Sequence, residues 1–150
     1  MFIRALVAFL LLPGMVGFVV PLLIAGFDPW RGHKSIAGLA LASIGIGLLL
    51  WCVRDFYVAG KGTLAPWDPP QHLVDIGFYR YSRNPMYISV LTIIAGWAAY
   101  FGSWLLLAYA CAFALVFHLR VLYKEEPWLQ KQFGTDWQRY KRNVPRWLIS

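Results

Sequence analysis

The chain has 150 residues, of which 59% are hydrophobic and 14% are charged, and its formal net charge is +7. A soluble domain carries about 25% charged residues, so the composition excludes an ordinary soluble domain and predicts that lipid covers part of the surface. The length favours a single domain, residues 1–150. Anionic lipid headgroups account for the positive charge, so we predict membrane lipids as partners and no nucleic acid.

Two long uncharged segments open the chain and predict membrane-spanning helices. Residues 5–27 reach the length of about 20 apolar residues that a bilayer core requires, and they exceed the apolar core of a signal peptide. Pro13 and Pro21 are predicted to kink this helix, provided that neighbouring helices bond the freed carbonyls. Residues 35–53 form the second segment. Small residues recur along it at i, i+4 and i+7, which predicts a close helix contact: Gly38, Ala42 and Gly45.

Two further apolar segments, residues 86–101 and residues 104–123, are separated by a Gly-Ser pair and predict a helical hairpin. The expected fold is therefore all-α: a multi-pass membrane bundle of about four spans, followed by short amphipathic helices at the membrane interface. Twelve of the 14 Lys and Arg residues fall on one side of these spans, and only Arg31 and Lys34 fall on the other. The positive-inside rule then predicts both termini and the polar segments in the cytoplasm.

The middle loop, residues 61–85, ends in basic residues immediately before a predicted helix. Asn84 suits the N-cap of that helix, and Pro85 suits its first position. A helix N-terminus offers free N–H groups and partial positive charge, so together with Arg80 and Arg83 it predicts a site for a carboxylate or phosphate. The alternative is that both arginines simply lie among lipid headgroups.

The tail, residues 124–150, begins with the adjacent acids Glu125 and Glu126. Pro127 follows them, which predicts that the last span ends or bends there. Adjacent acids repel each other, and an unpaired acid near the membrane is costly, so each needs a partner. Gly134 is predicted to divide the rest of the tail into two short amphipathic helices. The expected partners of the acids are a cationic ligand or two arginines of the middle loop: Arg80 and Arg83.

The cysteines and histidines indicate no further chemistry. Cys52 and Cys111 lie inside apolar segments, and we predict that both are buried small side chains without a disulfide or a nucleophilic role. The three histidines lack the spacing of metal ligands, so no metal site is predicted: His33, His72 and His118.

The chain resembles the isoprenylcysteine carboxyl methyltransferase family in two motifs, GFYRYSRNPMY and EEPWLQKQFGTDWQRYKRNVPR, which a predicted hairpin separates. It is similar also to the small bacterial membrane methyltransferases grouped with that family, and more distantly to phospholipid methyltransferases. The resemblance covers roughly residues 61–146. It implies an enzyme that uses S-adenosylmethionine, held between the loop and the tail. The implied acceptor is a lipophilic small molecule or a lipidated substrate, such as the carboxylate of a prenylated cysteine.

The resemblance also implies which residues form the site. Arg83 and Glu126 would be catalytic. The prenylcysteine enzymes carry histidine where this chain has Asn84, which leaves open a second interpretation: a non-catalytic membrane scaffold or assembly subunit with the same fold. The implied cofactor-binding set comes from both motifs: Gly77, Tyr79, Arg83, Asn84, Pro85, Tyr87, Glu125 and Glu126.

The implied chemistry agrees with these residue types. Methyl transfer from a sulfonium to an ionised carboxylate needs neither a metal nor a strong base, and positioning supplies up to about 7–11 kcal/mol. Arg83 and the helix N-terminus suit the carboxylate of the donor, and the acid pair suits its ammonium or sulfonium. Tyrosines of the first motif are candidates for stacking on the adenine or the cation: Tyr79, Tyr81 and Tyr87.

Overall fold

A computed structural model describes residues 10–61 and 70–148, and every regular element in these two ranges is a helix. The all-α prediction is therefore confirmed for the described residues. Small parts of the first predicted span, the middle loop and the tail lie outside them. The elements in chain order are η1 (Leu10–Val19), α2 (Val20–Phe27), α3 (Ile36–Gly60), η2 (Gly77–Arg80), α4 (Pro85–Phe101), α5 (Trp104–Arg120), η3 (Val121–Glu125) and α6 (Glu126–Asn143).

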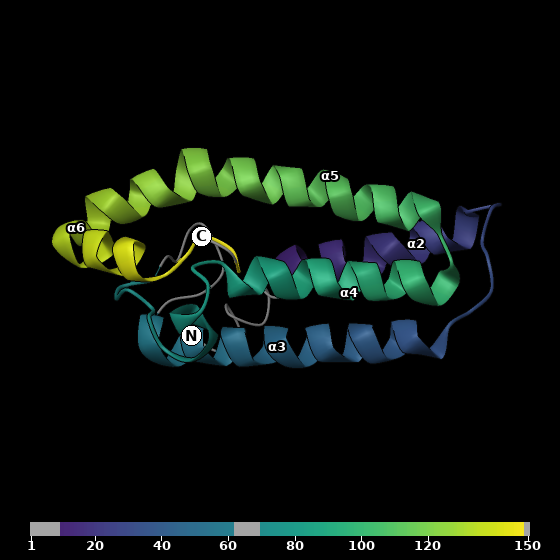
Figure 1. Ribbon diagram of the computed structural model, residues 1–150, viewed down its shortest axis with the longest axis horizontal. Coiled ribbons are helices and arrows are strands. Elements are labelled where there is room, and N and C mark those ends of the chain that lie inside the picture. Colours follow the sequence, from purple (N-terminus) through teal and green to yellow (C-terminus); the bar gives the residue numbers. More distant parts are fainter. Residues whose placement is uncertain (1–9, 62–69, 149–150) are drawn as a thin grey trace.

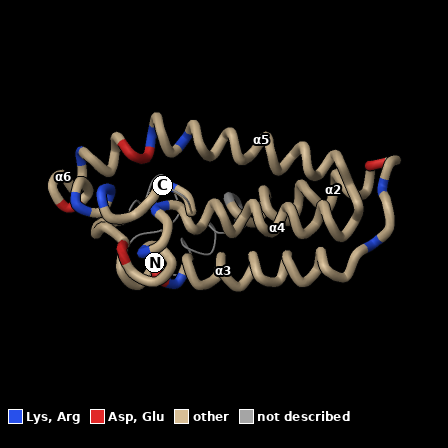
Figure 2. Tube along the Cα trace, viewed as in Figure 1, with Lys and Arg blue, Asp and Glu red and all other residues tan. Residues whose placement is uncertain are grey.

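The long helices run side by side (Figure 1), with α4 between α3 and α5. Charged residues gather at the two ends of this bundle and leave its middle uncharged (Figure 2). Two helices are long and apolar enough to cross a membrane, Ile36–Gly60 and the continuous helix Trp104–Asn143, and two apolar helices are shorter. Large apolar side chains on their outer faces are exposed, among them Leu50 and Leu115. This surface suits lipid, as expected of a membrane protein.

The closest helix contact joins α3 to α4 through small residues, as predicted. A Cβ added to Gly38 would lie 2.2 Å from the backbone nitrogen of Tyr100, and a Cβ added to Gly96 would lie 2.5 Å from the backbone nitrogen of Ala42. Because such distances are shorter than any real contact, the two backbones can approach this closely only where side chains are absent. The helix α3 also continues seven residues beyond its apolar segment, to Gly60.

Neighbouring helices bond the carbonyls that a proline frees near the start of the chain, as predicted. Pro21 has no N–H for the carbonyls four and five residues before it, those of Gly17 and Val16. Both carbonyls lie in the π-helical segment η1, which contains Pro13, whereas Pro21 lies in the first turn of α2. The indole N–H of Trp97 donates to the Gly17 carbonyl, and the hydroxyl of Tyr109 donates to the Val16 carbonyl, both at 3.1 Å. Helices α4 and α5 therefore satisfy the carbonyls that Pro21 leaves unpaired.

Removing either donor is expected to destabilise the bundle. Trp97→Phe and Tyr109→Phe should each lower the free energy of unfolding by about 1 kcal/mol, because each leaves a carbonyl without a partner. The measurement is unfolding by SDS in mixed detergent micelles. Tyr100→Phe is the matched control, since no hydrogen bond from the Tyr100 hydroxyl is found within the described residues. Equal losses in the control and the two test variants would contradict the assignment.

The predicted hairpin joins α4 to α5 through Gly102, whose φ of +58° favours glycine. The hydroxyl of Ser103 caps α5 by accepting the N–H of Leu106 at 3.1 Å. The same hydroxyl donates to the buried carboxylate of Asp28, in the connector between α2 and α3. This bond ties the connector to the hairpin at the end of the bundle opposite α6 (Figure 1).

The last span does not end at the acid pair, which was one of the two predicted alternatives. Its helical path continues through the π-helical segment η3 into α6, whose first turn holds Pro127. Gly134 has non-helical angles (φ 49°, ψ −114°) and divides α6 into two short helices, which confirms that prediction. Trp137 and Tyr140 of the second helix are buried in a cluster that includes Leu73, so its apolar face packs on the middle loop.

The prediction for the cysteines was half wrong. Cys52 is fully buried on α3, whereas Cys111 is exposed on α5. Hydropathy places a residue within a membrane segment, and it does not say which face of the helix the residue occupies.

Candidate functional site

The two motifs meet at the carboxylate of Glu126, the first residue of α6. Its Oε1 accepts Nη1 of Arg83 at 2.8 Å and Nε of Arg146 at 2.7 Å, and its Oε2 accepts Nη2 of Arg146 at 3.0 Å. The ammonium of Lys141 lies 3.7 Å from Oε2. The side chains of Glu126 and Arg83 are each only 8% exposed. A buried carboxylate therefore joins the middle loop to the C-terminal end of the tail.

Burial and charge act in opposite directions on this carboxylate. Burial alone would raise the pKa of Glu126. The hydrogen bond from Arg146 and the charges of Arg83, Arg146 and Lys141 outweigh burial and lower the pKa below its ordinary value of 4.5. Glu126 is therefore ionised at neutral pH and holds the guanidinium groups in place.

Arg83 is held on several sides. Its guanidinium lies 5.5 Å from the centroid of the Trp137 ring, within the range of a cation–π contact. Its backbone N–H donates to the carbonyl of Pro145 at 2.9 Å. The Nε atom of Arg83 is buried and has no hydrogen-bond partner among the described residues. The side chain is thus fixed while part of its donor capacity remains unused.

The loop before α4 is also bonded to the C-terminal segment by Asn84. This residue occupies the predicted N-cap position and Pro85 the first helical position, but the Asn84 side chain does not cap α4. Its amide Nδ2 donates instead to the carbonyl of Arg146 at 3.0 Å, and the hydroxyl of Ser82 donates to the same carbonyl at 3.3 Å. The prediction of a side-chain cap was wrong because a tertiary contact uses the amide.

A pocket of about 500 Å³ opens beside this network. Four of its eight lining residues are cationic. Glu126 is the only acid within the described residues that forms salt bridges with these cations, so the pocket is electropositive and suits an anionic group such as a carboxylate. The lining comprises Arg83 and one continuous segment of the tail: Lys141, Arg142, Asn143, Val144, Pro145, Arg146 and Trp147.

The neighbouring acid, Glu125, has different partners. The hydroxyl of Tyr87 donates to its Oε1, and Nε of Arg120 donates to the same oxygen at 2.8 Å. The ring of Tyr87 stacks on Phe117 with 4.4 Å between centroids. The two acids therefore have separate sets of partners, although they are adjacent in the chain.

The other implied site residues shape the loop and do not line this pocket. Gly77 has a φ of +56°, and a Cβ there would lie 2.0 Å from Oδ2 of Asp55 on α3, so only glycine fits. Tyr79 is buried in a cluster with Cys52, and its carbonyl accepts the hydroxyl of Tyr140 at 2.6 Å. Stacking of Tyr79 on a ligand would require the loop to open.

Four cations pair with the two acids, and the sequence predicted one of them. Arg83 pairs with Glu126 as expected, whereas Arg80 is exposed and forms no salt bridge within the described part of the chain. The missed cations are partners of Glu125 or Glu126 from outside the middle loop: Arg120, Lys141 and Arg146. Arg146 could have been predicted as a partner, because it is the last residue of the second motif. Nothing in the spacing of the other two indicated their partners.

No cluster of three metal-ligating side chains occurs in residues 10–61 or 70–148. A family model described as phospholipid methyltransferase matches residues 33–136. Together with the apolar helical bundle, this match identifies the chain as a membrane methyltransferase. The chain belongs to the phospholipid methyltransferase family. It is also 36% identical over 63 residues to an uncharacterized protein of Haemophilus influenzae, an alignment that covers 42% of this chain and 100% of that protein. No solved structure matches the chain.

Proposed function

We propose that the protein is an S-adenosylmethionine-dependent methyltransferase that transfers a methyl group to a lipophilic acceptor, and that residues 1–150 form one integral-membrane domain. The donor would lie between the middle loop and the tail. The observation that carries this proposal is the electropositive pocket in which Arg83 and Arg146 are fixed by Glu126. Family membership supports the methyl transfer.

The residues present fit the amino-acid portion of the donor. Its carboxylate suits the cations of the pocket, and the unused Nε of buried Arg83 supports this assignment. Both oxygens of Glu126 are already bonded to arginines, so we assign Glu126 a positioning role and Arg83 the ligand contact. Glu125 is 30% exposed and is the better candidate for a cationic group.

The donor supplies an activated methyl group on a sulfonium. The protein must then align the acceptor with that carbon and exclude water, which favours transfer without a metal. A carboxylate acceptor, such as a prenylated cysteine, attacks without losing a proton. An amine acceptor must lose one, and the carboxylate of Glu125 could accept it.

The location of the site follows from charge. Most charged residues gather at the end of the bundle that holds the pocket (Figure 2), and the positive-inside rule favours the cytoplasmic side for that end and for both termini. The exposed apolar faces of α3 and α5 support a lipidic acceptor that enters from the bilayer.

Calorimetry of the detergent-purified protein tests donor binding. S-adenosylhomocysteine should bind, and methylthioadenosine, which lacks the amino-acid portion, should bind at least about tenfold more weakly, a difference of about 1.4 kcal/mol. Arg146→Gln should lose most of this preference. Arg139→Gln is the matched control, because Arg139 is exposed on the same helical tail and outside the pocket. Equal affinities for the two ligands would refute the carboxylate assignment.

A non-catalytic scaffold is the second candidate, and one observation favours it. The network around Glu126 is internally paired, and Asn84 bonds to backbone, so these contacts could serve the fold alone. A folded wild-type protein that fails to bind S-adenosylhomocysteine would favour the scaffold.

A further inference from the structure

Arg120, at the end of α5, is held in an unusual way for an arginine at a membrane surface. Its Nε donates to the Tyr87 hydroxyl at 3.1 Å and to Oε1 of Glu125 at 2.8 Å. Neither of its terminal amines has a hydrogen-bond partner among the residues that the structure describes. The side chain is 43% exposed. One edge of the guanidinium is therefore fixed by the protein, and the other edge is available.

The free edge has a defined chemical preference. The two terminal N–H groups of a guanidinium lie parallel and match two oxygens of a phosphate or carboxylate. Because Tyr87 and Glu125 hold the Nε–H group, less side-chain freedom remains to be lost when an anion binds. The ring of Tyr87 is itself held by stacking on Phe117. The arrangement is therefore preorganised for an oxyanion.

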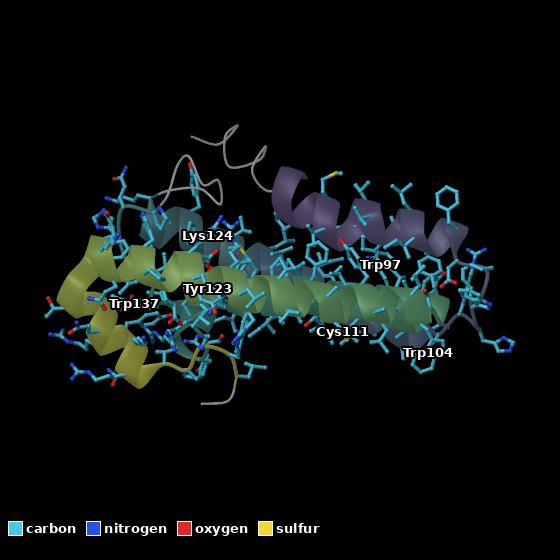
Figure 3. All side chains as sticks on the ribbon, turned by 90° about the horizontal axis from the view of Figure 1, so that it is seen from above. Trp97, Trp104, Cys111, Tyr123, Lys124 and Trp137 are labelled. Carbon is cyan, nitrogen blue, oxygen red and sulfur yellow. The ribbon has the colours of Figure 1, made fainter. Side chains whose placement is uncertain are left out.

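The surroundings of Arg120 match a membrane lipid. Tyr123 and Lys124 are exposed at the same end of the helix (Figure 3), where a tyrosine and a second cation suit the headgroup region. Toward the middle of the bundle, the outer face of α5 presents an exposed apolar strip that suits an acyl chain: Leu115, Val116 and Leu119.

We propose that Arg120, assisted by Lys124, binds the phosphate of a membrane lipid headgroup, with an acyl chain along the outer face of α5. This site is distinct from the pocket around Glu126. Its contacts share Tyr87 and Glu125 with the implied cofactor-binding set, so binding of S-adenosylhomocysteine is measured beside lipid binding to tell the two sites apart.

Native mass spectrometry of the protein in detergent micelles tests the proposal, with phosphatidylglycerol as the probe. Wild type should retain phosphatidylglycerol and should not retain diacylglycerol, which has the same chains without the phosphate. Arg120→Gln should weaken phosphatidylglycerol binding about tenfold, and Arg120→Lys should recover part of it, because a lysine keeps the charge and loses the fork. Gel filtration and binding of S-adenosylhomocysteine report separately on the fold and on the proposed function.

Two further variants guard against misinterpretation. Lys124 forms no hydrogen bond with Tyr87 or Glu125, so Lys124→Gln should fold normally and weaken binding about fivefold, roughly the share of one exposed charge. Arg54→Gln is the matched control, since Arg54 is an exposed arginine with an adjacent acid at 3.2 Å on α3. A loss in Arg54→Gln equal to that in Arg120→Gln, or undiminished binding in Arg120→Gln, would overturn the proposal.

Discussion

Glu126→Gln is expected to have the largest effect of any single substitution at the site. It should lower the free energy of unfolding by about 3–5 kcal/mol, because it leaves the buried guanidinium of Arg83 without its counter-charge. It should also abolish binding of S-adenosylhomocysteine, since neither Arg83 nor Arg146 would remain fixed at the pocket. The two effects share one cause, the loss of the carboxylate that joins the loop to the tail.

The measurement combines SDS unfolding with calorimetry under conditions in which the variant is still folded. Asp136→Asn is the matched control, because Asp136 lies exposed on the same helix, and it should leave both properties unchanged. Glu126→Asp keeps the charge on a shorter side chain and should recover part of each. A Gln variant as stable as wild type would show that the pairing contributes nothing.

The same carboxylate predicts a dependence on acidity. The folded-state pKa of Glu126 lies below its ordinary value of 4.5, so its stabilisation is fully present above that value. The stabilisation is lost as the pH falls through the folded pKa. Glu126→Gln should lack this component, so its loss of stability relative to wild type should shrink in acid.

The fold could be predicted largely from the sequence, because hydropathy and small-residue spacing are local signals. Pro21 predicted that neighbouring helices bond the freed carbonyls, and Gly38 predicted a close helix contact. Neither pattern predicted which residues are the partners. The site was harder. Arg83 and Glu126 are 43 positions apart in the chain, and their pairing was predicted only from the cost of leaving an acid unpaired near the membrane.

The rest of the site depends on features that have no local sequence signal. The π-helical segment η3, which ends at Glu125, shifts the helical register, so Arg120 bonds to the acid five positions later, where an α-helical pattern expects three or four. Arg146 reaches Glu126 only because the chain leaves α6 after Asn143 and turns back. Asn84 is a residue type that often caps a helix, but the same turn brings the carbonyl of Arg146 close to its side-chain amide, which donates to that carbonyl instead.

Gly38→Ala is expected to have the second-largest effect, although it adds a single methyl group far from the pocket. The new Cβ would lie 2.2 Å from the backbone nitrogen and 2.6 Å from the Cα of Tyr100. Backbone atoms cannot move aside as a side chain can, so α3 and α4 must separate, which should lower the free energy of unfolding by about 1–3 kcal/mol. SDS unfolding in mixed micelles measures this change.

Gly47→Ala supplies a matched control on the same helix. Nothing lies within 4 Å of a Cβ added there. Alanine is a better helix former than glycine by about 1 kcal/mol, so Gly47→Ala should be neutral or stabilising. Opposite signs for the same substitution on α3 would show that contact with α4, and not helix propensity, selects glycine at position 38. Equal effects in the two variants would contradict the close contact. Because α4 begins beside Arg83, its displacement in Gly38→Ala should also weaken binding of S-adenosylhomocysteine, and Gly47→Ala should leave that binding unchanged.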